Sequence, residues 1–125
     1  MCFYIHSEHQ EVKIATKDIV CYKILQKTIN NNLTSPYQNA LYFTKANTHP
    51  VIKKVKAFSF CKYNSNDIEA GLHSYSALHQ ARKTGKFGNN IHKAIIPKGT
   101  KYYYNPTYKQ YVSLELKVWK RNLNK

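Results

Sequence analysis

The chain has 125 residues, with 20 Lys and Arg against 6 Asp and Glu, and its formal net charge is +14. A chain of this length with 42% hydrophobic and 14% aromatic residues fits one folded domain, 1–125, and its composition argues against a disordered chain despite the high charge. No apolar run approaches the roughly 20 residues of a membrane span, and the first residues lack a signal-peptide pattern, so we expect a cytoplasmic protein without a membrane partner.

Strands are expected first at 18–25, 40–44 and 51–60, which are rich in Ile, Val, Tyr and Phe and are separated by turn-forming residues. A short helix is expected over 77–83, because Ser76 can cap its start and Gly85 can end it.

Three further strands are expected towards the C-terminus, at 91–96, 101–104 and 111–118, the last two joined as a hairpin. The last of these alternates apolar with polar residues, which places Glu115 on the polar face of a half-buried strand. Strands with one or two short helices predict an α+β fold, a single compact domain built mainly on antiparallel sheet.

The three cysteines, Cys2, Cys21 and Cys61, are widely spaced and form no C-x-x-C pair. This pattern argues against a disulfide framework and against a zinc site. We therefore expect no metal and no cofactor, and reduced thiols as in the cytosol.

The positive charge is concentrated in the C-terminal half. Residues 1–69 carry 9 basic and 5 acidic groups, a balance of +4, whereas residues 70–125 carry 11 basic groups and one acidic group, a balance of +10. Such a surface favours an anionic partner. A merely lysine-rich soluble protein remains the alternative.

The segment Gly71–Ser76 runs directly into the expected helix. A helix N-terminus can bind phosphate, and His73, Tyr75 and Ser76 could add hydrogen bonds and a stacking face. The alternative is an ordinary turn and cap.

A second segment, 97–104, interleaves lysines with tyrosines in a way that suits stacking on bases and contact with phosphates. Because strand residues alternate in direction, Tyr103 cannot share a platform with Tyr102 and Tyr104, and one set should be core. Aromatic strand packing beside solvated lysines is the alternative. Residues 119–125 could be a frayed basic tail.

Signatures of catalysis are scarce. There is no Gly-rich phosphate loop, no G-x-S-x-G and no H-E-x-x-H, and paired carboxylates are rare among six acids. We therefore lean towards a protein that binds without catalysing a reaction.

Several segments resemble a family of small, uncharacterised proteins of bacteria and bacteriophages. The similar pieces are Met1–Cys2, Asp18–Lys23, Thr34–Gln38, Gly71–Tyr75 and Ile95–Tyr103. The resemblance implies no assigned activity.

A second, weaker resemblance is to the ADP-ribosyltransferase-like fold, in which Tyr-Arg, Ser-x-Ser and a late Glu line an NAD cleft. Tyr22–Lys23, Ser74–Ser76 and Glu115 occur here in that order, but Lys23 replaces the arginine and Glu115 lacks the usual second glutamate. The resemblance implies a degenerate fold of this type, with Glu115 as the catalytic residue if the protein is an enzyme.

Three functions follow from these observations. The first is non-catalytic binding of a nucleotide-like, phosphate-bearing ligand such as an ADP-ribose derivative, which in a phage could sequester a host signalling nucleotide as counter-defence in the host cytoplasm. The others are an NAD-using ADP-ribosyltransferase-like enzyme and a basic module that binds nucleic acid or inhibits a protein. The expected ligand-binding side chains are Lys23, His73, Tyr75, Ser76, Arg82, Lys98, Lys101 and Tyr102.

Overall fold

A computed structural model describes residues 3–4, 11–35, 41–47, 49–60, 67–84 and 90–123. The strands in these ranges are β1 (Phe3–Tyr4), β2 (Lys13–Ile14), β3 (Ile19–Lys27), β4 (Leu33–Thr34), β5 (Leu41–Phe43), β6 (Val51–Lys54), β7 (Ser59–Phe60), β8 (Asp67–Ala70), β9 (Leu72–Tyr75), β10 (Asn90–Ile96), β11 (Lys101–Asn105), β12 (Gln110–Ser113) and β13 (Glu115–Asn122). The helix is α1 (Leu78–Thr84). Cys2, Cys61 and Gly85, which were expected to be two free thiols and a helix end, lie outside the described residues.

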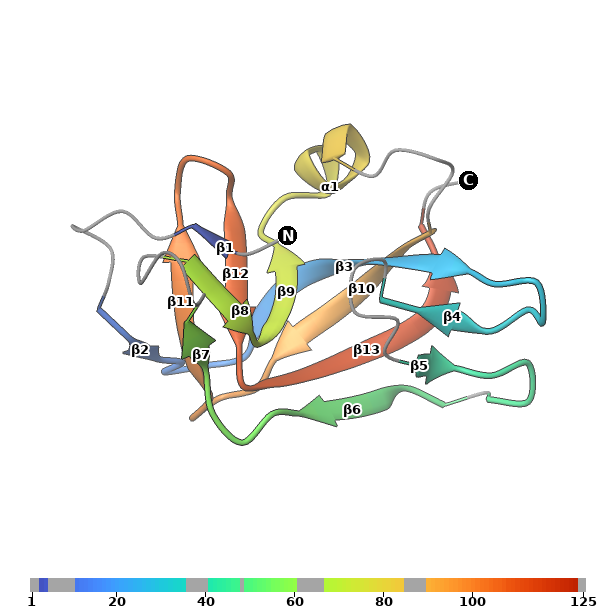
Figure 1. Ribbon diagram of the computed structural model, residues 1–125, viewed down its shortest axis with the longest axis horizontal. Coiled ribbons are helices and arrows are strands. Elements are labelled where there is room, and N and C mark those ends of the chain that lie inside the picture. The colour runs from blue at the N-terminus through green and yellow to red at the C-terminus, as the bar shows by residue number, and fades with distance from the viewer. Residues whose placement is uncertain are drawn as a thin grey trace.

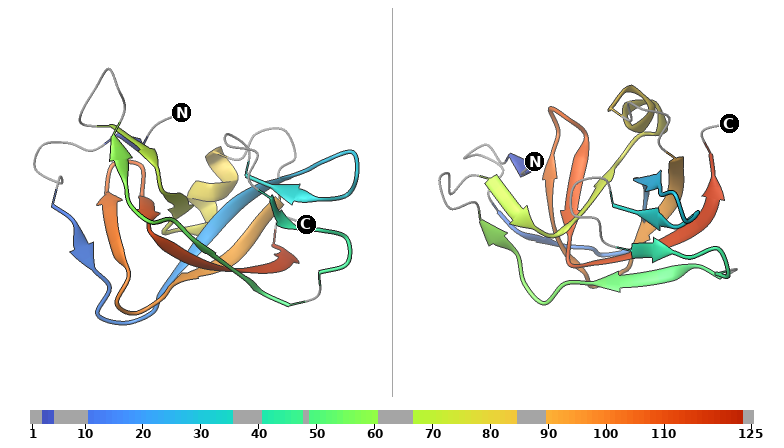
Figure 2. Two further views of the ribbon diagram at one scale, coloured as in Figure 1. Left: turned by 60° about the horizontal axis from the view of Figure 1, so that its bottom comes forward. Right: turned by 45° about the vertical axis from the view of Figure 1, so that its right-hand side comes forward.

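The strands form two antiparallel sheets. The larger sheet has 10 strands, in the order β2-β11-β12-β9-β3-β10-β13-β6, with β4 and β5 attached beside β3. The smaller sheet has the order β1-β8-β7. The larger sheet curls strongly, so that β11 and β12 stand across the direction of β3, β10 and β13 (Figures 1 and 2). Its path ends in two edge strands, β2 and β6.

Strand β3 lies near the middle of the larger sheet because its β-branched and apolar residues can be buried on both faces. It pairs with β10 over seven residues, from Asn90 opposite Leu25 to Ile96 opposite Ile19. This register puts Cys21 opposite Ala94 and Lys23 opposite His92, all on one face of the sheet.

The strand expected over 111–118 is divided in two by a bend at Leu114. Strand β12 pairs with β11 and β9, whereas β13 pairs with β10 and β6. The alternation of buried residues nevertheless continues across the bend, through Val112, Leu116 and Val118. Residues 119–122, for which the sequence also allowed a frayed end, belong to β13.

Three apolar clusters hold the fold together. The main core fills the concave face of the larger sheet, where Cys21, Ala94 and Val118 meet Phe43 and Leu33 from the short strands β4 and β5. A second cluster packs Phe58 edge-on against Tyr103, with ring centroids 4.9 Å apart. The third lies between α1 and the opposite face of β3 and β10.

Helix α1 has seven residues and covers only part of that opposite face. Ala81 contributes no exposed surface and packs with Ile24 and Ile91 of the sheet. With one short helix among the described residues, the domain is mostly β, and the expected α+β class is corrected in that respect. The expectation of a single compact domain built mainly on antiparallel sheet is confirmed.

Candidate functional site: two basic cavities and a buried lysine

Lys23, expected to hold phosphate, is instead buried beside the main core. The alternation of β3 puts it on the same face as Cys21 and Leu25, and its side chain is only 5% exposed. Its Nζ atom donates a hydrogen bond to the carbonyl oxygen of His73 at 2.7 Å and lies 5.5 Å from the centre of the Tyr42 ring. The fold thus brings Lys23 and His73 together, but the lysine contacts the backbone rather than an open site.

Burial determines the titration of this cluster. It lowers the pKa of Lys23 from 10.5 to about 8, a change that the neighbouring Cys21 thiol partly offsets. Burial, together with the charge of Lys23, lowers the pKa of His73 to about 3, and burial raises the pKa of Cys21 to about 11. Lys23 therefore lies near a neutral His73 and a protonated Cys21, neither of which compensates its buried positive charge. Keeping Lys23 protonated in the folded state lowers the free energy of unfolding.

The residues expected around the helix start are separated by the fold. Tyr75 lies opposite Tyr22 and Gln110 in the sheet and packs in the cluster under α1. Ser76 Oγ is 3.4 Å from Tyr104 Oη, and its backbone N–H donates to the carbonyl of Lys109. Arg82 is exposed in the last turn of α1.

Lys98 and Lys101 share a shallow cavity of about 410 Å³ with Lys54 and Glu115. Gly99 lies between the two lysines at φ +88°, in a turn closed by the Thr100 N–H donating to the Pro97 carbonyl at 3.1 Å. This hydrogen bond places Lys98 and Gly99 at the centre of the turn.

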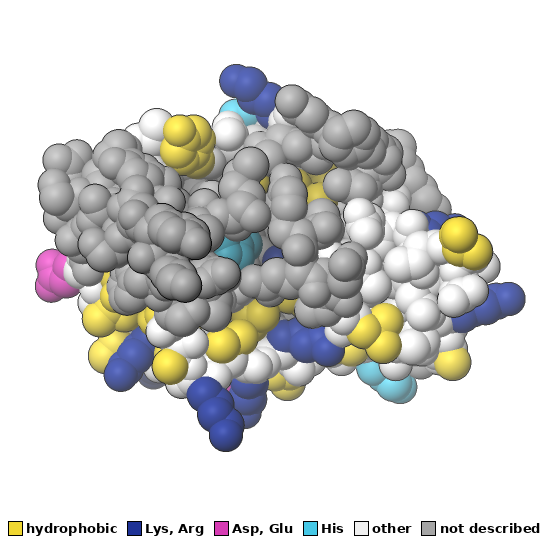
Figure 3. Space-filling view, viewed as in Figure 1, with side chains coloured by type: hydrophobic (Ala, Val, Ile, Leu, Met, Phe, Trp, Pro, Cys, Tyr) yellow, Lys and Arg dark blue, Asp and Glu magenta, His cyan; other side chains and the backbone are white. Residues whose placement is uncertain are grey.

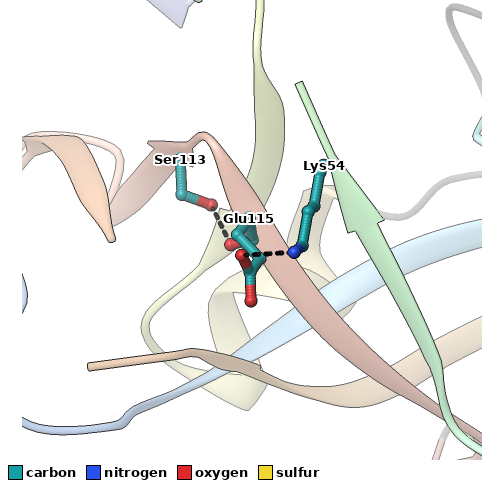
Figure 4. A network of polar contacts seen from close by, with 3 residues as sticks. All are labelled: Lys54, Ser113 and Glu115. Carbon is teal, nitrogen blue, oxygen red and sulfur yellow. Dashed lines mark hydrogen bonds and ion pairs between the residues drawn. The ribbon is translucent and has the colours of Figure 1, made fainter. Parts of the chain in front are cut away.

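The acid of this cavity is already paired. Lys54 Nζ lies 3.7 Å from Glu115 Oε1, and Ser113 Oγ donates to the backbone carbonyl of Glu115 at 3.0 Å (Figure 4). The Lys54 side chain is 71% exposed, so this ion pair contributes little to stability. It does reduce the net positive charge that the cavity offers to an anion.

The remaining expected residues lie on different faces of the larger sheet. Tyr102 turns away from Lys101 and packs against Tyr111 and the main core, with ring centroids 5.7 Å apart. As the alternation predicted, Tyr103 lies on the other face, and at 9% exposure it is the buried member. Glu115 and Lys23 also lie on opposite faces, because Leu116, not Glu115, shares the main core with Cys21.

A larger cavity lies at the end of the molecule formed by β4, β5, the end of β3 and the end of β13. It measures about 920 Å³. We call it the basic cavity, and its lining is Lys27, Asn31, Leu33, Lys45, Asn90, Lys120, Arg121, Asn122 and Leu123. In Figure 3, basic side chains project at this right-hand end of the molecule.

Lys120 forms the fixed wall of the basic cavity. Its Nζ atom donates to three backbone carbonyls after β5: Thr44 at 3.1 Å, Lys45 at 3.1 Å and Asn47 at 2.6 Å. The ammonium group has three protons, so all its donors are used inside the protein. Lys120 thus contributes positive charge but no free hydrogen bond.

Three other cations of the basic cavity are available. Lys27, Lys45 and Arg121 are exposed, and their side chains form no ion pair or hydrogen bond within the described part of the chain. Two amide side chains complete the wall, with Asn122 Nδ2 donating to Asn90 Oδ1 at 3.1 Å. The described lining therefore has four positive charges and no carboxylate.

The sequence did not predict this cavity because its cations come from three separate segments: β3, β13 and the loop that follows β5. These segments are brought together only by the pairing of the strands. The signal that was available is Lys120–Arg121, which continues the alternation of the last strand.

No family model, no curated protein and no solved structure matches this chain. Among the described residues, no cluster of His, Cys, Asp or Glu could hold a metal ion. The described part also contains no helix that is long and apolar enough to cross a membrane.

Proposed function

We propose that this protein binds a nucleotide-like, phosphate-bearing anion without transforming it, and that the basic cavity is the binding site. One observation carries the proposal: four cations line a cavity of about 920 Å³ whose described lining has no carboxylate. Small-ligand sites usually measure about 300–1,000 Å³, so the cavity has room for a dinucleotide or an ADP-ribose derivative.

The side chains suit phosphate in complementary ways. Arg121 can bind phosphate oxygens with two parallel N–H groups, whereas Lys27 and Lys45 act as flexible point charges. Lys120 is held by three carbonyls and adds a fixed positive potential. The amides of Asn31, with its left-handed backbone at φ 62°, and Asn90 could recognise a base or ribose.

The lack of a general acid or base in the described lining supports binding rather than turnover. Retention of an intact nucleotide is the chemistry that sequestering a host signal would need. In a phage, such a protein would act in the host cytoplasm.

The experiment is thermal unfolding with NAD, ADP-ribose and cyclic di- and oligonucleotides, followed by heat release and mass analysis of the bound compound. A ligand at 100 times its Kd adds about 2.7 kcal/mol and should raise the Tm by several degrees. An intact released compound supports the proposal. A compound altered by the wild type but not by Glu115→Gln would replace it with the ADP-ribosyltransferase-like enzyme.

Charge reversal locates the site. Lys27→Glu combined with Arg121→Glu should weaken binding by more than about 100-fold, since two charge-assisted contacts become repulsions. Lys13→Glu with Lys17→Glu, on exposed residues elsewhere, makes the same change in net charge and should preserve most of the affinity.

The shallow cavity is the competing location. If Lys98→Glu with Lys101→Glu abolishes binding while the Lys27 and Arg121 pair does not, the ligand binds there instead. If no variant differs from the control pair, the attraction is generic and the basic cavity is not a site.

A further inference from the structure

The face of the larger sheet on which α1 packs is only partly covered by the helix, and it carries a row of side chains across four neighbouring strands. Val20 lies opposite Ile95, Ile95 opposite Lys117, and Lys117 opposite Ile52. Val20 is 50% exposed and Ile52 is 56% exposed, although both are large and apolar. The row thus places partly exposed apolar side chains on both sides of Lys117.

Trp119 lies beside this row on the same face of β13. The Nζ atom of Lys93, on β10, is 5.4 Å from the centre of the indole ring, and that of Lys117 is 5.2 Å away. Both distances are typical of cation–π contacts. Two ammonium groups from adjacent strands therefore lie close to the indole ring.

The backbone beneath Trp119 is fixed. His92 contributes no exposed surface, and its Nδ1 atom lies 2.8 Å from the carbonyl oxygen of Trp119, to which it donates. The pairing of β10 with β13 shifts between His92 and Ala94, at this same point. A buried side chain thus anchors the irregular strand that presents the indole.

The charges on this face are unbalanced. Beyond their contacts with the indole, Lys93 and Lys117 form no hydrogen bond or ion pair within the described residues. The nearby strand positions add Arg121, while Glu115 is already paired with Lys54. This face therefore offers uncompensated positive charge around an aromatic ring.

We infer that this sheet face binds single-stranded nucleic acid, with a base stacked on Trp119 and the flanking phosphates bound by Lys93 and Lys117. An aromatic ring on a sheet, bordered by lysines, matches what an unpaired strand presents: base faces alternating with phosphates. A duplex hides its base faces, and an acidic peptide does not alternate a planar ring with a charge at every residue as an unpaired strand does. None of these three side chains lines the basic cavity, so this site is separate from the proposed nucleotide site.

The chain has one tryptophan, so its fluorescence reports this face alone. The experiment titrates the protein with a 12-nucleotide oligothymidylate at 50 and 200 mM salt. Stacking should quench Trp119. A duplex of the same length and an inorganic polyphosphate of equal charge should not.

Substitutions test the two parts of the contact separately. Trp119→Leu should weaken oligonucleotide binding by about 5- to 150-fold, measured by anisotropy of a labelled strand, whereas Trp119→Phe should retain most of it. Lys93→Gln with Lys117→Gln should reduce the slope of log affinity against log salt by about 1.4, since each phosphate contact on a single strand contributes about 0.7. Lys13→Gln with Lys17→Gln, at exposed positions elsewhere, is the matched control.

Several results would overturn the inference. They are an absence of quenching by the oligonucleotide, equal quenching by polyphosphate or duplex, and an unchanged salt slope in the Lys93 and Lys117 variant. A blue shift on vesicles containing 30% phosphatidylserine, without a response to the oligonucleotide, would assign the face to lipid. Lys27→Glu with Lys45→Glu changes two cations of the basic cavity that lie on neither β10 nor β13, so loss of the nucleotide site and loss of this site are distinguishable.

Discussion

Replacing Lys23 with methionine should make the protein more stable at neutral pH, even though a hydrogen bond is lost. The side chain is 5% exposed, and burial lowers its pKa from 10.5 to about 8. The unfolded chain therefore holds this proton more tightly than the folded chain, and protonation opposes folding. The difference of 10.5 − 8 = 2.5 corresponds to about 3.4 kcal/mol at 1.36 kcal/mol per pKa unit.

The sign of this effect defines its pH window. Well above pH 10.5 Lys23 is neutral in both the folded and the unfolded state, so its burial carries no charge penalty. As the pH falls from 10.5 to about 8 the penalty grows, and below about 8 it is complete. Methionine matches the length of the buried stem but loses the hydrogen bond to the His73 carbonyl, worth about 0.5–1.5 kcal/mol net. At pH 7 we expect Lys23→Met to gain about 2 kcal/mol.

The assay is urea unfolding followed by Trp119 fluorescence at pH 7, 8.5, 9.5 and 10.5. The stability advantage of Lys23→Met over wild type should decrease by about 3 kcal/mol across this range. Tyr111 is present in both proteins and cancels in the difference, and Cys21 is replaced with alanine in both because its pKa depends on the charge of Lys23. Lys13→Met, on the exposed strand β2, should change stability by less than about 0.5 kcal/mol at any pH.

Two results would refute this reasoning. A constant stability difference between wild type and Lys23→Met from pH 7 to 10.5 would mean that Lys23 titrates normally despite its burial. A variant that is less stable at every pH would mean that the contact with the His73 carbonyl outweighs the cost of the buried charge.

Three further substitutions give independent checks. Gly71→Ala should cost about 2–3 kcal/mol in urea unfolding, because a Cβ atom would overlap the Val112 methyl at a φ of +155°; an unchanged midpoint would contradict that packing. Lys120→Met should cost about 2–3 kcal/mol and speed proteolysis after β5, since three carbonyls lose their donor; unaltered protease resistance would show that the loop is held otherwise. His73→Gln should flatten the loss of stability as the pH falls from 6.5 towards 3, since the folded pKa is about 3; parallel acid-unfolding curves for both proteins would exclude His73 as the cause.

Local pattern was enough to predict most of the sheet. The expected strands at 18–25 and 91–96 correspond to β3 and β10, because a run of β-branched residues has few other ways to be buried. The strand expected over 51–60 is divided into β6 and β7, and the one over 111–118 into β12 and β13. Both breaks occur where the chain passes from one set of partner strands to another, which periodicity alone does not report.

The candidate site was less predictable, for two physical reasons. The burial of Lys23 could have been predicted, because the alternation from Cys21 to Leu25 places it on a buried face. Its positive charge was instead taken to indicate an anion site. The basic cavity could not be predicted from the sequence, because Lys27, Lys45 and Arg121 are brought together by pairing between strands that are far apart in the sequence. Pairing partners depend on the whole fold rather than on local pattern.

The open edges of the larger sheet affect how the protein behaves at high concentration. An unpaired edge exposes backbone N–H and C=O groups on which another chain can add a strand, the first step of many aggregates. At the two ends of the main strand path, β2 has two residues, Lys13 and Ile14, and β6 ends in Lys53 and Lys54. Short edges that carry lysine make strand-by-strand growth unfavourable, so the sheet can remain open without recruiting neighbours.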